Sequence, residues 1–347
     1  MHSSPALLIE DFFSERIPIP LIDVRSPVEF KEGHIPGAIN IPLFDDHERE
    51  AIGIIYKQRG KEEAVMKGLE IVSPKLAEFI RETKENSPTK KVIVYCFRGG
   101  MRSNSFSWLM NTAGLNSKII EGGYKQYRRF ILKQFEKKRN LILLGGPTGG
   151  GKTEIIKLLK KKGEQVIDLE ALANHRGSAF GFIHMEAQPS QQFFENKLGE
   201  ELLKTNENKP LWLEDESFMI GSCRIPFPLW LQMKECPIIS LKVAFEKRVE
   251  RLLKDYGTAD AGSLEKAILG IRQKLGGSNL KIALEALKSG NLKKIAEMAL
   301  HYYDEAYEYN HAKRKHKNIY ALVSETEKAF DNANLIMNFY NSHFHEH

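Results

Sequence analysis

The chain has 347 residues, 42% of them hydrophobic and 28% charged, as is typical of a soluble globular protein with two domains. No segment contains the roughly 20 consecutive apolar residues that a membrane-spanning helix needs. Residues 1–5 lack the basic and apolar regions of a signal peptide. The three cysteines are too few and too irregularly spaced for a disulfide framework or a zinc site. We therefore exclude a membrane-embedded or disulfide-stabilised protein and expect a cytoplasmic one.

The net charge of +6 is modest, but the basic residues gather in three runs. These runs are Arg128–Arg129 with Lys133 and Lys137–Arg139, Lys157 with Lys160–Lys162, and Lys313–Lys317. Such runs bind polyanions such as nucleic acids, and they also occur on solvated helix faces. Charge alone leaves both interpretations open.

The first part of the chain alternates short apolar runs with segments of helical spacing. Strands are predicted over 21–24, 91–95 and 117–120, and helices over 74–84 and 103–112. Strands that alternate with helices form a parallel sheet. Residues 124–139 are basic and compatible with a helix. We expect a first domain over 1–128, a basic linker helix over 129–139, and a second domain over 140–347.

From Asn140 the alternation restarts. Strands are predicted over 141–144, 165–168, 210–213 and 238–243, with a helix over 153–162. After about residue 245 the spacing is helical, with amphipathic helices expected over 264–274, 280–288 and 292–308. The sequence thus predicts an α/β fold whose second domain ends in a helical C-terminal region.

Cys96 ends a predicted strand and opens a loop that leads into a predicted helix. Backbone N–H groups and the helix dipole at such a place stabilise an anion and favour a thiolate. Gly99 and Gly100 allow the backbone to curl tightly. Arg98 and Arg102 add positive charge, and Arg102 stands where a guanidinium can bind an oxyanion through two hydrogen bonds. We predict a nucleophilic Cys96, with a structural cysteine as the alternative.

Residues 146–153, Gly-Pro-Thr-Gly-Gly-Gly-Lys-Thr, match the phosphate-binding loop Gly-x4-Gly-Lys-Thr between a strand and a helix. In this loop glycines turn backbone N–H groups toward a phosphate, a lysine supplies a charge, and a threonine can reach a magnesium ion. The candidate diphosphate-binding residues are Gly146, Gly149, Gly150, Gly151, Lys152 and Thr153. The motif indicates a diphosphate or triphosphate. No motif for guanine or adenine recognition is visible, so the sequence does not establish use of ATP.

Acidic and basic residues follow two further strands, at the sheet edge where ligands bind in such folds. They are Asp168, Glu170, His175 and Arg176 after one strand and Glu214, Asp215 and Glu216 after the other. The carboxylates could hold the metal of an NTPase or only cap the strands. His175 and Arg176 could bind a diphosphate or an RNA backbone, or cap a helix.

Residues 5–128 resemble rhodanese domains. The resemblance is carried by Asp23-Val24-Arg25-Ser26-Pro27, Glu29-Phe30, Gly33–Ala38 and Asn40-Ile41-Pro42. In such domains the loop cysteine carries a persulfide or a selenium atom. The spacing Cys-x5-Arg-Ser also fits the related phosphatases, whose loop holds a phosphate, so selenophosphate or thiophosphate would satisfy both patterns.

The full set of motifs resembles bacterial tRNA 2-selenouridine synthases over nearly the whole chain. Besides the two loops, it includes the segments 168–181, Leu213–Ser217 and Tyr302–Tyr309. Phe97 stands where the family has a tryptophan, which keeps an aromatic ring next to the cysteine.

The resemblance implies two reactions at the wobble uridine of a tRNA. Geranyl diphosphate first alkylates the 2-thio group, and selenium from selenophosphate then replaces the geranylthio group. It further implies that the 146–153 loop holds the geranyl diphosphate. Cys96 would carry selenium as S-selanylcysteine, with Arg98, Gly99, Gly100 and Arg102 binding the departing phosphate. The basic runs would contact tRNA.

Several further expectations follow from this resemblance. No cofactor is tightly bound, geranyl diphosphate and selenophosphate are co-substrates, and magnesium at Thr153 is the candidate metal. A selenophosphate-producing enzyme is a candidate partner, and no membrane is. A geranyl pocket could be formed by Phe180, Phe182, Phe193 and Phe194, or by Phe218, Phe227 and Trp230, although core packing is the alternative for these rings.

Two other classes of protein remain open at this point. One is a sulfurtransferase or phosphatase domain fused to an NTP-dependent kinase or NTPase, which would turn over ATP without tRNA. The other is a non-catalytic tRNA-binding protein, which would bind tRNA in a salt-dependent manner and leave its nucleosides unchanged.

Overall fold

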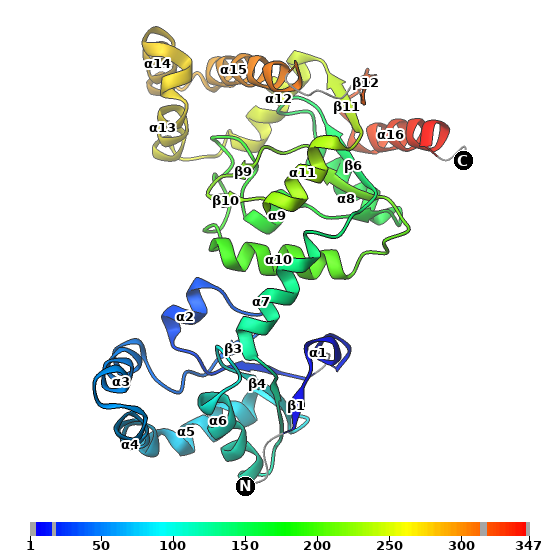
Figure 1. Ribbon diagram of the computed structural model, residues 1–347. Helices are drawn as coiled ribbons and strands as arrows, with labels where there is room; N and C mark the ends of the chain where they lie inside the picture. Colours follow the sequence, from blue (N-terminus) through cyan, green and yellow to red (C-terminus); the bar gives the residue numbers. More distant parts are fainter. Residues whose placement is uncertain (1–4, 16–18, 313–317, 345–347) are drawn as a thin grey trace. The chain divides into compact units, whose positions relative to one another are not determined.

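A computed structural model describes residues 5–15, 19–312 and 318–344 (Figure 1). The basic run at 313–317 and residues 1–4 lie outside this part of the chain. The chain divides into two compact units. Unit 1 comprises Met1–Gln134 and Ser190–Gly199, and unit 2 comprises Phe135–Pro189 and Glu200–His347.

Unit 1 contains a five-stranded parallel sheet with the strand order β1-β5-β4-β2-β3. Its strands are β1 (Ala6–Leu7), β2 (Leu21–Asp23), β3 (Ile39–Asn40), β4 (Lys91–Tyr95) and β5 (Asn116–Ile120). The parallel sheet and its three longer strands are confirmed. The two-residue strands β1 and β3 were not predicted, because two residues are too few to show a periodicity.

The helices of unit 1 surround this sheet. They are α1 (Ile9–Glu15), α2 (Pro27–Glu32), α3 (Asp46–Arg59), α4 (Lys61–Val72), the 3-10 turn η1 (Ser73–Lys75), α5 (Leu76–Asn86), α6 (Met101–Thr112) and α7 (Gly123–Gln134). A linker helix was expected over 129–139; the observed helix α7 begins at Gly123, ends at Gln134 and belongs to unit 1. It packs there through the buried Tyr124, Tyr127 and Ile131.

The core of unit 1 lies on both sides of β4, whose residues Val92–Tyr95 are buried. Val92 and Val94 pack in one cluster with Phe106 and Met110 of α6. Because β4 lies in the middle of the sheet, its carboxyl end places Cys96 at the centre of that sheet edge.

Unit 2 contains a second five-stranded parallel sheet, with the order β12-β11-β6-β8-β7. Its strands are β6 (Leu141–Gly145), β7 (Gln165–Val166), β8 (Leu211–Glu214), β11 (Ile238–Val243) and β12 (Ile319–Ser324). A separate antiparallel pair is formed by β9 (Met219–Ile220) and β10 (Cys223–Arg224). Central strand β6 carries the phosphate loop at its carboxyl end.

The helices of unit 2 include the one that the two units share. They are α8 (Lys152–Lys161), α9 (Leu169–Ala173), α10 (Gln191–Leu203), α11 (Phe227–Glu235), α12 (Phe245–Tyr256), α13 (Ala261–Gly270), α14 (Arg272–Lys288), α15 (Leu292–Ala312) and α16 (Ala329–Phe344). Figure 1 shows α13, α14 and α15 grouped together. None of the helices in the described ranges is long and apolar enough to cross a membrane.

The region after residue 245 is largely helical, as expected, but it also contains a strand that was not predicted. Strand β12 returns to the sheet and pairs with β11 over its whole length, from Ile319 to Ser324. Helix α16 then packs Ala333, Ile336 and Tyr340 into the same core as β6 and β11. The α14 segment is also interrupted, because Gly276 has φ 76 and leaves the helical conformation.

Candidate functional site: a cysteine loop and a phosphate-loop cavity

The cysteine loop of unit 1 makes a side-chain contact with α6 and backbone contacts with α7. Cys96 is 3% exposed, and its Sγ lies 3.3 Å from Oγ of Ser103 at the start of α6. From the other side, the N–H groups of Tyr124 and Lys125 donate to the carbonyls of Cys96 and Phe97, each at 2.9 Å. The first turn of α7 therefore fixes the position of the cysteine backbone.

Gly99 is required at its place in this loop. Its φ is 64, and a Cβ there would lie 2.9 Å from the carbonyl oxygen of Ile120. Gly100, which was predicted for the same reason, has open space at its Cβ position. The tight curl of the loop thus depends on Gly99.

Arg102 is paired beside the loop, whereas Arg98 is exposed. Arg102 donates from Nη1 to Oε2 of Glu29 at 2.6 Å and from Nη2 to Oε1 at 3.2 Å. Burial disfavours the charged Glu29, but this ion pair outweighs it and lowers the pKa of Glu29 below its usual value. An oxyanion in the loop would have to compete with Glu29 for Arg102.

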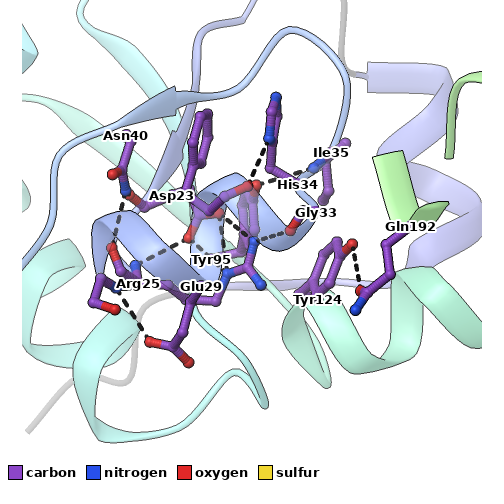
Figure 2. A network of polar contacts seen from close by, with 12 residues as sticks. Asp23, Arg25, Glu29, Gly33, His34, Ile35, Asn40, Tyr95, Tyr124 and Gln192 are labelled. Carbon is purple, nitrogen blue, oxygen red and sulfur yellow. Dashed lines mark hydrogen bonds and ion pairs between the residues drawn. The ribbon is translucent and has the colours of Figure 1, made fainter. Parts of the chain in front are cut away.

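A buried polar network connects the rhodanese-like motifs with Tyr95 of β4 and Tyr124 of α7 (Figure 2). Arg25 donates from Nη2 to Asp23 at 2.6 Å and to the carbonyl of Gly33 at 2.7 Å. Its guanidinium lies 3.9 Å from the ring centroid of Tyr124. The hydroxyl of Tyr95 accepts from Ile35 N–H at 3.2 Å. The rhodanese-like residue Arg25 therefore packs against Tyr124 in the first turn of α7.

Residues 190–199 complete this network. Asn196 is fully buried and donates to the carbonyl of His34 at 2.7 Å and to the Tyr124 hydroxyl at 2.9 Å. Arg128 donates to Oδ1 of Asn196 at 2.7 Å and pairs with Glu195. This set could not be predicted, because residues 68 to 162 positions apart leave no local pattern in the sequence.

The phosphate loop of unit 2 has the conformation that its glycines were expected to allow. Gly146, Gly149 and Gly151 have φ of 137, 80 and 80, and a Cβ at Gly146 would lie 2.5 Å from the carbonyl of Leu241. The Lys152 ammonium donates to the Gly146 carbonyl at 3.0 Å. These residues form a cradle of the kind that binds a phosphate group.

Gly150 differs from the other glycines of this loop. It is not among the glycines with a positive φ, and its N–H donates within the loop, to the carbonyl of Pro147 at 3.2 Å. A Cβ at Gly150 would lie 3.1 Å from the same oxygen. The residue was predicted to turn its N–H toward a phosphate; a phosphate would have to compete with Pro147 for that N–H.

Two arginines of α12 support the same loop and were not predicted. Arg248 donates to the Thr148 carbonyl at 3.2 Å and pairs with Asp304 at 2.7 and 2.6 Å. The Arg251 guanidinium lies against Gly151, about 3.0 Å from where its Cβ would be. Both come from the C-terminal region, where the sequence carries no phosphate-binding motif.

Three glutamates gather beside Thr153. Its hydroxyl lies 3.1 Å from Glu170 and 3.3 Å from Glu214. Burial and the nearby carboxylates raise the pKa of Glu214 well above its usual value, and burial followed by repulsion from Glu170 raises that of Glu216 to about 8. Burial likewise raises the pKa of Glu170. The cluster therefore favours a cation or bound protons.

One cavity of about 580 Å³ joins the loop to these groups. Glu214 does not line the cavity itself, but it accepts a hydrogen bond from Thr153, which does. His175 is buried and does not line the cavity, and burial lowers its pKa. The structure thus brings the two predicted acidic sets together. The predicted residues that line the cavity are Gly146, Gly149, Gly150, Gly151, Lys152, Thr153, Asp168, Glu170, Arg176, Asp215 and Glu216.

The lining of the cavity also includes apolar and aromatic side chains. Met185, Phe218, Trp230 and Met233 contribute to its lining. The rings of Phe218 and Trp230 meet edge to face with centroids 5.2 Å apart. Two aromatic sets were predicted for a geranyl pocket. Phe218 and Trp230 of one set line this cavity, whereas Phe180 and Phe194 of the other set are buried in the core.

The family models cover both units. Residues 139–334 match the model described as the tRNA 2-selenouridine synthase AAA domain, and residues 5–130 match the rhodanese-like domain. The chain belongs to the tRNA 2-selenouridine synthase family. It is therefore a tRNA-modifying enzyme, and its rhodanese-like and phosphate-loop folds are those of the family.

Three curated tRNA 2-selenouridine synthases illustrate the similarity. The one from Shewanella denitrificans is 35% identical, with 89% of this chain and 95% of the relative covered. The one from Bordetella petrii is also 35% identical, with 87% and 90% covered. The one from Pseudomonas fluorescens is 43% identical over 68% of this chain and 65% of the relative. The family resemblance thus extends across both units.

Proposed function

We propose that the chain converts the 2-thiouridine at the wobble position of a tRNA to 2-selenouridine in two steps, through a geranylated intermediate. The observation that carries the first step is the mixed lining of the unit 2 cavity. Its phosphate loop suits a diphosphate, and Met185, Phe218, Trp230 and Met233 offer an apolar wall to a hydrocarbon chain. Geranyl diphosphate combines these two properties in one molecule.

In the first step the uridine sulfur attacks C1 of the geranyl group. The carbon–oxygen bond breaks, pyrophosphate leaves with the electron pair, and the uridine loses its N3 proton. The loop N–H groups, Lys152 and Arg176 would stabilise the charge that develops on the pyrophosphate, since fixed donors act most strongly where charge increases in the transition state. The cavity wall would shield the allylic carbon from water.

Magnesium is the proposed ion for this site. The residues fit it, because Thr153 lies between Glu170 and Glu214 and Glu214 Oε2 has no hydrogen-bond partner among the described residues. In the described ranges no three His, Cys, Asp or Glu side chains form a ready cage, which is consistent with an ion that keeps several waters. When bound, magnesium would neutralise part of the diphosphate charge.

Cys96 is the proposed nucleophile of the second step, with S-selanylcysteine as its expected intermediate. The buried thiol beside Ser103 and the curled loop with Arg98 and Arg102 offer selenophosphate a sulfur nucleophile and an anion site. Selenium of S-selanylcysteine then attacks C2 of the uridine, and geranylthiolate leaves. A small-molecule thiol next attacks the Cys96 sulfur of the resulting S–Se bond and forms a disulfide with Cys96. The selenium keeps the electron pair of the broken bond and is released as 2-selenouridine. Alkylation favours this exchange because it converts the 2-thio group into a thiolate leaving group.

The first step is tested with Lys152→Ala and a tRNA that contains 2-thiouridine. Incubation with geranyl diphosphate alone, followed by mass spectrometry of the nucleosides, should show geranylation by the wild type and at least a roughly hundredfold slower geranylation by the variant, the order of magnitude for loss of a charged transition-state contact. Lys242→Ala, which removes an exposed lysine of unit 2 outside the three basic runs, is the control. Geranylation at the wild-type rate by Lys152→Ala, or rapid ATP turnover without tRNA, would contradict the proposal.

The second step is tested with Cys96→Ala and chemically prepared selenophosphate. The variant should geranylate normally and form no 2-selenouridine. The phosphorus product, identified by NMR, shows which atom the thiolate attacks. Formation of S-selanylcysteine leaves the electron pair of the P–Se bond on phosphorus and gives phosphite. Release of phosphate would instead mean attack on phosphorus and would exclude the selanyl intermediate.

A further inference from the structure

Three large apolar side chains are exposed between the cysteine loop and the outside of α6. Met101 and Trp108 lie seven residues apart and therefore on one face of the helix. They are 52% and 61% exposed, and Phe97, two residues before Gly99 in the loop, is 39% exposed. On the opposite side, Phe106 and Met110 fill the core. We call Phe97, Met101 and Trp108 the α6 outer face.

These three side chains lie outside the buried cluster that forms the core of unit 1 around β4 and α6. A tryptophan at 61% exposure leaves most of its ring in water, which costs free energy that a polar residue would save. Cys96 itself is 3% exposed, so a reacting group must enter the loop to reach it. The α6 outer face begins at the mouth of that loop, because Phe97 follows Cys96 directly.

The charge of the surrounding segment favours an anionic partner. From Lys91 to Ile120 the chain contains no Asp or Glu, but it contains Lys91, Arg98, Arg102 and Lys118. Arg102 is neutralised by Glu29, so Arg98 supplies the exposed charge of the loop. Its guanidinium lies 5.9 Å from the Phe97 ring centroid. The exposed Lys125 is tied to the same place, since its N–H donates to the Phe97 carbonyl at 2.9 Å.

Exposed aromatic rings among cations are the surface that unpaired nucleotides bind, because bases stack on the rings and phosphates meet the charges. A base that enters a buried loop also leaves its own stack, and its neighbours then need new stacking partners. An acidic protein partner would use the same charges, but it would not require rings next to the thiol.

We propose that the α6 outer face binds the unpaired tRNA nucleotides next to the modified uridine while that uridine is at Cys96. Phe97 and Trp108 stack on bases, Met101 fills the space between them, and Arg98 with Lys125 contacts phosphates. This proposal rests on the proposed role of Cys96 in the second step. It assigns the face to RNA and not to the protein that supplies selenophosphate.

The test compares the two steps in the same full-length protein. With Trp108→Ala, kcat/KM for the selenation of geranylated tRNA should fall about 5- to 100-fold, the usual effect of removing a stacking ring. Geranylation of 2-thiouridine tRNA should change less than about twofold. Trp108→Phe should retain most of the activity. Leu69→Ala, which alters an equally exposed side chain on α4 (58%), is the control and should change neither step.

Two direct measurements separate this proposal from the proposed function. Binding of a fluorescent anticodon stem-loop RNA should weaken in Trp108→Ala and Phe97→Ala, with an unchanged slope of affinity against salt, because stacking releases no counterions. Loading of Cys96 with sulfur from thiosulfate, measured as intact mass, should stay at the wild-type level and show that the loop is folded. If the wild type forms no 2-selenouridine, the proposed function fails. The RNA-binding measurement then still shows whether the α6 outer face binds RNA.

Two outcomes would overturn the inference. One is that both alanine variants bind the RNA with the affinity of the wild type and selenate geranylated tRNA at the wild-type rate. The other is that the loss occurs only when a selenophosphate-producing enzyme supplies the donor and disappears with saturating chemical selenophosphate. That result would assign the α6 outer face to a protein partner.

Discussion

Glu29 and Arg102 together decide how the cysteine loop meets an anion. The carboxylate is partly buried, holds the guanidinium through two hydrogen bonds, and also accepts from Ser26 N–H at 3.1 Å. Arg102 is thus pre-positioned beside the loop but neutralised. A bound oxyanion would replace Glu29 as the partner or share Arg102 with it, so Glu29 limits the affinity of the loop for anions.

Glu29→Gln should lower the free energy of unfolding of the wild type by about 1–2 kcal/mol at neutral pH, the scale of a charged hydrogen bond. Because the pKa of Glu29 is lowered in the folded protein, its contribution is present above the unfolded value near 4.5 and is lost as the pH falls through the folded pKa. Urea unfolding at neutral and acidic pH measures this. If the difference in unfolding free energy between the wild type and Glu29→Gln persists or grows at acidic pH, the stabilising role assigned to the ionised Glu29 is contradicted.

The same substitution should strengthen anion binding at the loop. Freed from the carboxylate, Arg102 can give both of its N–H groups to an oxyanion. Glu29→Gln should therefore lower the Kd for sulfate or phosphate several-fold, as measured by the protection of Cys96 from alkylation. Glu32→Gln, in the same helix, is a control that should leave this protection unchanged.

Helix α10 shows at the scale of one element what the sequence could and could not predict. Strands such as β4, β6 and β11 were predicted because their β-branched and apolar runs are local. Cys96 and Lys152 could be named as candidates because the glycines around them are local too. Residues Gln191–Leu203 carry no such sign. They are divided between the units after Gly199, and Asn196 contacts Tyr124 and His34 far away in the chain.

For the candidate site, too, the sequence predicts only residues that stand in a local pattern. Glu170 and Glu214 could be predicted because each follows a strand and the order of parallel strands brings strand ends together. Arg248 and Arg251 could not, because they come from a helix whose packing on the loop leaves no motif.

Asn196→Ala should destabilise unit 1. The change leaves the buried carbonyl of His34 and the Arg128 guanidinium each without one partner, at a cost of about 2–4 kcal/mol. Hydrogen exchange should rise in α7 and the cysteine loop, since the network that holds Tyr124 is opened. Lys204→Ala, just past the exposed end of the same helix, is the control. Unchanged protection of α7 would mean that residues 190–199 do not stabilise unit 1.

The whole molecule places each proposed reaction within one unit. The described lining of the phosphate-loop cavity belongs to unit 2, and the cysteine loop with its supports belongs to unit 1. Neither constellation borrows a residue from the other. The two steps should therefore be separable by substitution without loss of the remaining step.

Full-length Cys96→Ala and Lys152→Ala should complement each other when mixed. The first protein would geranylate the tRNA, release it, and let the second complete the exchange. 2-Selenouridine should appear in the mixture, with a lag that shortens as protein concentration rises, and in neither protein alone. If Lys152→Ala rejects purified geranylated tRNA, the steps are not independent.

The allocation of residues 190–199 to unit 1 has a consequence for how this chain can be divided. The rhodanese-like family model ends at residue 130, and a gene cut there would look like a clean separation of two modules. The protein expressed from the first part would lack ten residues that its own fold uses, and those residues would remain on the second part with no core to enter. In this enzyme the boundary that a gene can be cut at and the boundary that the folded chain obeys are different, so a working split protein would have to carry residues 190–199 twice.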